Sequence, residues 1–478
     1  MKAVKRTYAV ELVIGAAVAV VWCGCASVPM KPRTDPAAVS SPQRISDSEL
    51  RQSRDAQSRA YGYYLQGLIS EQANQLDAAI DGYQRALRAD PRAGIVEIKL
   101  GAAYFRKGDF PRALVILEKA AGAEPQNIAV RQLLAIVQVT MGRMPAAIAT
   151  YESILAVDPH NQQAMVSLAD LYLVNREPEK AVMLYERLAA RKDASPNIYF
   201  NLGMLYSQLR RYDAAIENLE RTISLDARHV EAYMALGMVY ELKKEAQKSR
   251  QAYEQAILTN PDNPVAYFRL GQVYAEKGEF SAALEQFQHV IAINPRIPDV
   301  YIEIAQIHLK QKKYDAAVEV LEKGQEACKD PARFFLFLGV ANSLRENYTA
   351  AEDYFQKAIA AAAGSDLPFF YLGALYDKQG KREAAKEYFY KALEINPHNA
   401  DACNYLGYMY AEAGVNLEEA VDLIERALEV EPENGAYLDS LGWAYYKKGD
   451  IKAAISVLKE ALKISNSDEI MEHYDIVV

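Results

Sequence analysis

The chain has 478 residues, a formal net charge of −9 and four cysteines. An acidic chain without a basic face is a poor binder of nucleic acid, because it cannot neutralise the phosphates. Four cysteines in a chain of this length do not form a disulfide framework.

The first 24 residues are predicted to be a signal peptide. A short basic stretch, residues 1–6, precedes an almost wholly apolar stretch, residues 12–22. The apolar stretch is too short to span a bilayer as a helix, but its length is typical of a signal-peptide core.

The segment after this core carries a candidate lipid-attachment cysteine. Gly24 directly before Cys25 is similar to the bacterial lipobox, in which the cysteine is diacylated and becomes the first residue of the mature protein. Trp22 before Cys23 does not fit that motif, so Cys25 is the expected lipidation site. Glu11 and Trp22 depart from the motif, which leaves an ordinary cleaved signal or an uncleaved anchor as alternatives.

Residues 25–57 are expected to be a flexible tether, because they are rich in Ser, Pro, Asp and Arg and have no periodic apolar face. Ala26, and not Asp, follows the lipidation site. In a diderm bacterium, the resemblance to sorted lipoproteins then implies an outer-membrane protein that faces the periplasm. Three acyl chains would anchor it permanently.

Residues 58–466 are organised by two rows of small residues that recur every 34 residues, with one step of 35. We call the first row the comb. The comb consists of Gly67, Gly101, Ala135, Ala169, Gly203, Gly237, Gly271, Ala305, Gly339, Gly373, Gly407 and Gly442. The second row consists of Ala79, Ala113, Ala147, Ala181, Ala215, Ser249, Ala283, Ala317, Ala351, Ala385, Ala420 and Ala454.

The unit at residues 366–399 shows what one period encodes. Apolar residues at three- and four-residue steps predict two helices joined by a turn at Gly380, and Pro397 ends the second helix. Gly373 and Ala385 have almost no side chain, so the two helices are expected to cross closely there. The extra residue between Gly407 and Ala420 must be absorbed by the turn of its unit.

This period and these offsets resemble the tetratricopeptide repeat, whose pattern is W-x2-L-G-x2-Y, then A-x3-F, then A and P. The resemblance implies an all-α fold, a right-handed solenoid (superhelix) of about twelve helix–turn–helix units of 34 residues. Residues 467–478 are predicted to form a C-terminal capping helix or the opening of a further repeat. Its apolar side is expected to lie in the last groove; the alternative is a tail that docks on a partner.

No segment carries a pattern typical of catalysis or of metal or cofactor binding. The six histidines are scattered, and HExxH, GxSxG, paired cysteines and Gly-rich phosphate loops are absent from the sequence. Cys328 and Cys403 are interpreted as buried small hydrophobic residues, and the Glu472–His473 pair as a solvated helix face. We therefore expect no enzyme, no cofactor, no metal site and no small-molecule substrate.

A binding surface is the remaining route to a function. In the resembled family the first helices line the concave side, and the residues three before and one after the comb face inward. Apolar residues at those positions predict a groove for an extended or helical protein segment. The alternative is that they only pack against the neighbouring first helix. The predicted groove consists of Val166, Phe200, Met204, Met234, Met238, Phe268, Ile302, Leu336, Phe370, Tyr408 and Trp443.

The groove does not match two binding modes known in the family. The carboxylate clamp needs Lys three before the comb, and no unit has one there. An asparagine ladder would need Asn two before the comb, and only Asn201 occurs. The sequence favours a lipid-anchored, non-catalytic adaptor in the assembly of an envelope machine for pili, secretion or polysaccharide export. The alternatives are a regulatory arm of an envelope glycosyltransferase or peptidoglycan hydrolase, and a cytoplasmic scaffold.

Overall fold

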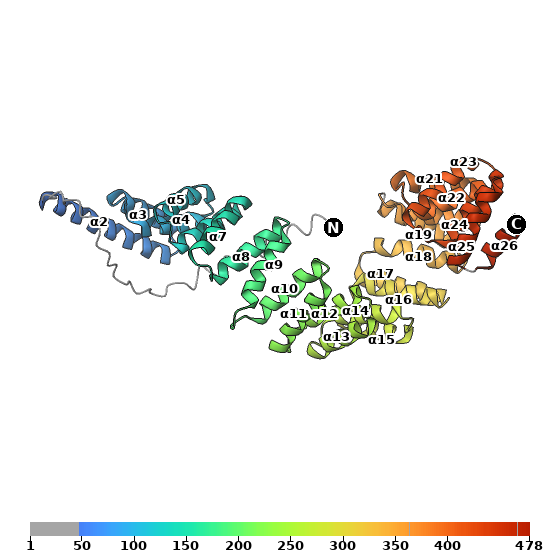
Figure 1. The fold of residues 1–478 in the computed structure, drawn as a ribbon, viewed down its shortest axis with the longest axis horizontal. Helices are drawn as coiled ribbons and strands as arrows, with labels where there is room; N and C mark the ends of the chain where they lie inside the picture. Colours follow the sequence, from blue (N-terminus) through green and yellow to red (C-terminus); the bar gives the residue numbers. More distant parts are fainter. Residues whose placement is uncertain (1–46, 363, 466) are drawn as a thin grey trace. The chain divides into compact units, whose positions relative to one another are not determined.

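The structure is a computed structural model that describes residues 47–362, 364–465 and 467–478. Within those ranges it contains 25 α-helices, α2 to α26, and no strand. Successive helices pack in tandem antiparallel pairs, from α2–α3 to α10–α11 and again from α14–α15 to α24–α25 (Figure 1). The all-α tandem-repeat fold predicted from the sequence is therefore confirmed.

The helices divide into two compact units, of which the first ends at Glu245. Each pair consists of a first helix, which carries the comb residue, and a second helix. The first helices are α2 (Asp47–Gln72), α4 (Gly94–Lys107), α6 (Ile128–Thr140), α8 (Gln162–Val174), α10 (Pro196–Gln208) and α12 (Val230–Leu242). The second helices are α3 (Leu76–Ala89), α5 (Phe110–Ala123), α7 (Met144–Val157), α9 (Pro178–Ala189) and α11 (Tyr212–Leu225).

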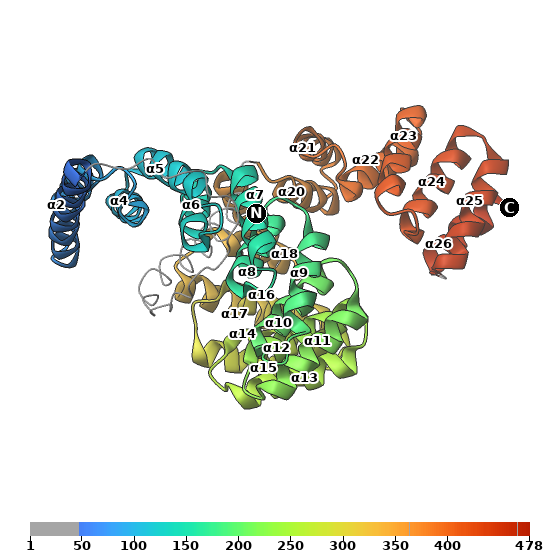
Figure 2. The ribbon, with the colours of Figure 1, turned by 60° about the vertical axis from the view of Figure 1, so that its left-hand side comes forward.

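The second unit runs from Ala246 to Val478 and continues the same alternation, as Figure 2 shows for its last helices. Its first helices are α14 (Pro264–Glu276), α16 (Pro298–Lys310), α18 (Ala332–Leu344), α20 (Leu367–Lys378), α22 (Ala400–Ala413), α24 (Gly435–Lys448) and the terminal α26 (Asp468–Val477). Its second helices are α13 (Ala246–Thr259), α15 (Phe280–Ile293), α17 (Tyr314–Cys328), α19 (Tyr348–Ala361), α21 (Arg382–Ile395), α23 (Leu417–Val430) and α25 (Ile451–Ile464).

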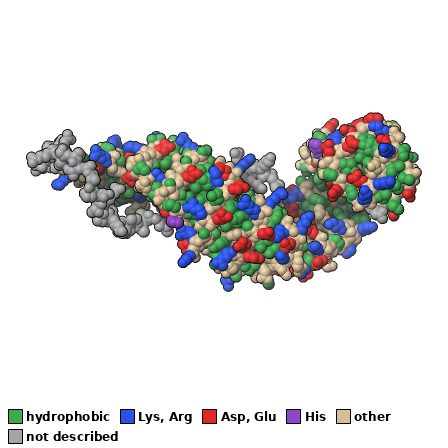
Figure 3. Space-filling model, in the orientation of Figure 1, with side chains coloured by type: hydrophobic (Ala, Val, Ile, Leu, Met, Phe, Trp, Pro, Cys, Tyr) green, Lys and Arg blue, Asp and Glu red, His purple; other side chains and the backbone are tan. Residues whose placement is uncertain are grey.

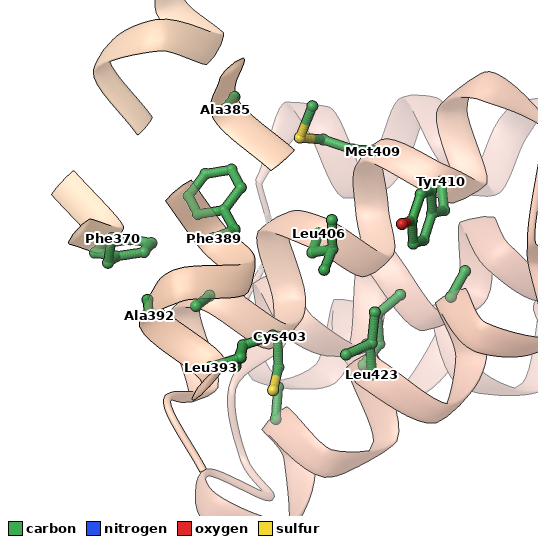
Figure 4. Close-up of a cluster of buried hydrophobic side chains, with 14 of the residues drawn as sticks. Phe370, Ala385, Phe389, Ala392, Leu393, Cys403, Leu406, Met409, Tyr410 and Leu423 are labelled. Atoms are coloured by element: carbon green, nitrogen blue, oxygen red, sulfur yellow. The ribbon is translucent and has the colours of Figure 1, made fainter. Parts of the chain in front are cut away.

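A large side chain of the second helix sits directly on the comb residue of the first. A Cβ added at Gly373 would lie 2.8 Å from Phe389 Cδ1 and 3.2 Å from the carbonyl oxygen of Ala385. Phe389 is fully buried, and its ring lies between Phe370 and Leu406 in Figure 4. The absence of a side chain at the comb therefore makes room for the aromatic ring that fills the centre of the pair.

Each turn inside a pair contains a residue with positive φ, seven positions after the comb. Glycine takes this position in six units, for example Gly380 with φ of 74°. The unit with the extra residue has two such residues, Gly414 and Asn416, with φ of 67° and 49°. The prediction that this turn absorbs the insertion is confirmed, because Asn416 starts α23 from a second left-handed conformation.

The start of the array differs from the prediction. Helix α2 begins at Asp47, inside the stretch 25–57 that was predicted to be a flexible tether. The sequence argument gave too much weight to the missing apolar face, because residues 47–57 continue a helix whose later turns are packed on α3. The predicted signal peptide and Cys25 lie outside the described residues. Among the helices that the structure describes, none has the length and apolarity needed to cross a membrane.

The substitution Gly373→Ala should destabilise its pair, because the new Cβ would overlap the Phe389 ring and press on backbone at Ala385. We expect a loss of about 1–3 kcal/mol in local stability. Hydrogen exchange of α20 and α21 by mass spectrometry measures this locally.

Gly62→Ala is the matched control, since Gly62 is helical and its added Cβ would meet nothing within 4 Å. The control should gain up to about 1 kcal/mol. Equal effects of the two substitutions would contradict the steric role of the comb.

Candidate protein-binding surface

The first helices form the more closely spaced side of each unit. Successive first helices contact one another directly at α4–α6 and α10–α12 in the first unit, and at α14–α16, α16–α18, α18–α20, α22–α24 and α24–α26 in the second. Over the described residues, no two successive second helices make contacts as extensive. In a curved stack the closer spacing lies on the concave side, so the first helices line the inner side of each unit locally.

The first unit carries the most exposed part of the predicted groove. Met204 on α10 and Met238 on α12 are each 41% exposed. Phe200 and Met234, one turn earlier on the same two helices, are half-buried. Because α10 and α12 are in contact, these four side chains form one surface, which we call the methionine patch.

Two neighbouring residues show how the methionine patch is held. The Phe200 ring lies 4.9 Å from the His229 ring, centroid to centroid. His229 caps α12, since its Nδ1 accepts a hydrogen bond from the Ala232 amide at 3.2 Å. Val166 on α8 is half-buried and packs against a core cluster that extends from α6 to α10. Within the methionine patch, Phe200 is therefore held by its contact with His229, and the two methionines are the members exposed to solvent.

In the second unit the predicted groove residues lie deeper. Phe268 and Leu336 are half-buried and pack against core side chains. Ile302 and Phe370 are only 8% and 6% exposed, so they belong to the core rather than to a free surface. For Phe370 the reason is its aromatic surroundings, because its ring packs against Phe389 at 5.8 Å and Tyr405 at 5.6 Å. For these residues the packing alternative describes the structure better than the groove.

The last two residues of the predicted groove, Tyr408 on α22 and Trp443 on α24, lie next to His473, which was not part of that prediction. The His473 ring of α26 stacks on the Trp443 ring with 4.4 Å between centroids, and it lies 6.4 Å from the Tyr408 ring. His473 Nδ1 lies 2.9 Å from Asp439 Oδ2. Helix α26 packs against α24 and α25 and buries Ile470, His473 and Val477.

The interpretation of the Glu472–His473 pair as a solvated face was wrong for His473, which is 9% exposed. A signal for its role was present in the sequence. His473 lies 34 residues after Asp439, one repeat period, and both take the position three before the comb. The inward-facing row therefore continues into α26, and its last members are polar: Asn404, Asp439 and His473.

The environment of His473 favours its charged form. The hydrogen bond with Asp439 raises the pKa of His473 above its usual 6.5, against the opposing effect of burial, and Glu469 and Glu472 of α26 act in the same direction as Asp439. Because the folded-state pKa is raised, the contribution of this pair to the docking of α26 is complete below about pH 6.5 and is lost as the pH rises through the raised value.

Two cysteines lie among the described residues. Cys403 is buried and Cys328 partly buried, and burial raises the pKa of both thiols. In the same residues no group of three His, Cys, Asp or Glu side chains could hold a metal ion. Acidic, basic and apolar side chains are interspersed over the face seen in Figure 3.

Trp443 emission should report the titration of His473, because the two rings are stacked. In a Trp22→Phe chain, Trp443 is the sole tryptophan. We expect a change in its emission with a midpoint above pH 6.5, as the pair with Asp439 is lost and α26 loosens. Asp439→Asn should move the midpoint down. A midpoint at or below 6.5 in the unsubstituted pair would contradict this assignment.

Comparison with family models finds tetratricopeptide repeats along the chain. A tetratricopeptide-repeat model matches residues 368–399, and a second one matches residues 49–128, 302–366 and 415–469. The N-terminal ARM-repeat model of tetratricopeptide repeat protein 21 matches residues 104–318. No match was found among curated protein sequences.

Several solved structures are similar to this chain. The Cut9–Hcn1 hetero-tetramer of the APC/C is 17% identical, with a TM-score of 0.43 over 90% of this chain and 99% of that one. Yeast Tom70 is 15% identical, with a TM-score of 0.46 over 87% and 94%. The C-terminal part of a TPR protein from Cytophaga hutchinsonii is 23% identical, with a TM-score of 0.41 over 49% and 96%.

The family models together span most of residues 49–469, with the period and the helix pairs that the structure shows. The chain belongs to the tetratricopeptide-repeat family.

Proposed function

We propose that this chain is a non-catalytic adaptor, anchored to a membrane by a lipid on Cys25, that holds a protein partner on the inner side of its repeats. Tetratricopeptide repeats are scaffolds for protein–protein interaction, and the chain is such a scaffold. The proposal adds where the partner binds and where the scaffold is attached.

The observation that carries the binding site is the exposure of the methionine patch. Met204 and Met238 keep 41% of their surface free on two helices that contact each other on the inner side. Methionine side chains are flexible and polarisable, so they adapt to apolar side chains of different shapes. An apolar segment of a partner, extended or helical, fits such a surface.

The N-terminal sequence supports the anchor. A basic stretch, an apolar stretch and Gly24–Cys25 follow one another in the order of a lipoprotein signal. The expected location is the outer membrane of a diderm bacterium, facing the periplasm. The setting that we propose is the assembly of an envelope machine for pili, secretion or polysaccharide export, by analogy with other lipidated repeat proteins.

A photocrosslinking amino acid at Met238, in intact cells, should yield one dominant adduct with an envelope protein, identified by mass spectrometry. A charge on the patch, Met204→Glu, should reduce that adduct by tenfold or more, because a buried carboxylate would face an apolar segment. The helical content should not change, since Met204 is 41% exposed.

The matched control is Met183→Glu on the second helix α9, where the methionine is 62% exposed. The control should leave the Met238 adduct intact. Adducts only between copies of this chain, or equal loss with Met183→Glu, would contradict the proposed binding site.

Lipid attachment is tested by labelled palmitate in a diderm host. We expect the full chain to incorporate the label and Cys25→Ser to lose all of it, because Cys25 supplies the acylated atom. Cys23→Ser is the control and should stay labelled. Label that persists in Cys25→Ser, or that is lost in Cys23→Ser, would refute the assignment of the anchor.

A further inference from the structure

At the C-terminal end of the second unit, the inner side carries tyrosines and carboxylates in place of aliphatic side chains. Two tyrosines of α22 stand there: Tyr405 is 40% exposed, and Tyr408 is half-buried. Burial is the first cause that raises the pKa of both hydroxyls. The next causes are the charges of Asp401, Asp377 and Glu469 at Tyr405, and of Glu412, Glu469 and Asp439 at Tyr408. Carboxylates of four successive first helices therefore converge on two aromatic side chains.

We call this site the acidic–aromatic surface. It consists of Tyr405, Tyr408, Trp443, Asp377, Asp401, Glu412, Asp439 and Glu469.

Some of these carboxylates are already engaged. Asp401 accepts a hydrogen bond from Tyr437 at 2.7 Å, and Glu412 accepts one from Arg382 at 2.7 Å. Asp439 binds His473 through Oδ2. Among the described residues, the side chains of Asp377 and Glu469 accept no hydrogen bond and form no ion pair within 4 Å. Burial raises the pKa of Asp377, and the charge of Arg382 acts in the opposite direction. The surface therefore keeps an excess of negative charge.

Two buried atoms at the same place lack a partner. Asp439 is 5% exposed, and its Oδ1 accepts no hydrogen bond from any described residue. The indole Nε1 of Trp443 is likewise buried without an acceptor among them. An unpaired buried carboxylate oxygen is costly, so a donor that reaches it gains more than it would at an exposed carboxylate.

The protein itself shows what the surface accepts. Besides Glu469, α26 contributes His473, whose ring stacks on Trp443 and whose Nδ1 lies 2.9 Å from Asp439 Oδ2. This arrangement places a flat nitrogen-bearing ring between an aromatic face and a carboxylate that raises its pKa. A guanidinium group is also planar, always carries a positive charge and has more donors.

We propose that the acidic–aromatic surface binds an arginine or lysine side chain of the partner segment, with its cation among Asp377, Asp439 and Glu469 and its apolar stem on Tyr405 and Tyr408. The bound donor displaces the His473 ring and takes its place beside Asp439. This inference rests on the proposed function, because it specifies the chemistry of the segment held on the inner side.

The charge of the surface selects this occupant over others. An acidic segment would meet like charge from five carboxylates, against which the surface holds Arg382, the His473 ring and Lys447, whose Nζ lies 4.9 Å from the centroid of the Trp443 ring. A second copy of the chain is a poor occupant as well, because its net charge is −9. Arginine and lysine fit both parts of the surface, since their stems are apolar and their ends are cationic.

The test is selection of random dodecapeptides on the full chain carrying Trp22→Phe. We expect the retained peptides to be enriched in arginine or lysine beside an apolar residue, and depleted in aspartate and glutamate. A retained peptide should change Trp443 emission on binding, because it displaces the His473 ring. The variant Asp377→Asn/Glu469→Gln should lower its affinity by roughly threefold to tenfold.

The control variant is Asp422→Asn/Glu429→Gln on the second helix α23, where both side chains are exposed. It should leave the affinity unchanged. Retained peptides without basic enrichment, or equal weakening by the two double variants, would overturn the inference and leave the apolar binding site standing. No retained peptide at all would overturn both.

Discussion

The contact between a side chain of the second helix and the comb residue of the first is the constraint on which every repeat depends. At Gly373 the ring of Phe389 occupies the volume that a Cβ would need. The same arrangement holds at Gly271 with Phe287, and at Gly442 with Leu458. Because the comb residue is small, the helix backbones lie close together, and the other large side chains of the first helix must point elsewhere. Some of them point to the inner side.

The packing at the comb fixes the backbone of the inner side but not its side chains. The residue types on the inner side can therefore differ from one unit to the next. Position three before the comb illustrates this freedom. It is a half-buried Phe200 in one unit, a core residue at Phe370, and a buried carboxylate at Asp439. The backbone at these positions repeats because the comb repeats. The side chains differ because packing at the comb does not restrict the residue type three positions before it.

This separation explains how much could be predicted from the sequence. The helix pairs, the turns and the absorption of the extra residue at Asn416 follow from local rules that recur in each unit. The burial of side chains on the inner side cannot be predicted from such local rules, because it depends on which side chains the neighbouring helices supply. Phe370 was expected at the surface and lies in the core, since Tyr405 packs on its ring. His473 was expected in solvent and is buried, because the row of inward-facing residues had not been extended to α26.

Side-chain hydrogen bonds between repeats also differ from one unit to the next. A tyrosine three after the comb donates to a glutamate of the preceding second helix, at 2.7 Å for Tyr172 and Glu152 and at 2.9 Å for Tyr445 and Glu425. On α16 the position three after the comb is occupied by His308, whose Nδ1 is buried without a partner among the described residues.

Burial there, and then the charge of Lys313, lowers the pKa of the His308 ring. His308 therefore does not supply the bond that the tyrosine hydroxyl makes in other repeats. The neighbouring position on α18 is Asn342, which donates to the Leu338 carbonyl of its own helix at 2.7 Å. Two successive repeats of the second unit thus lack the bond that ties others to the helix before them. A hydrogen bond to a charged group stabilises by about 1.5–3 kcal/mol. At α18 two ion pairs take its place: Arg345 Nη1 lies 3.1 Å from Asp315 Oδ1 of α17, and Arg333 Nη2 lies 2.6 Å from Asp299 Oδ1 of α16. The side chains that join neighbouring repeats therefore differ from unit to unit, as those of the inner side do.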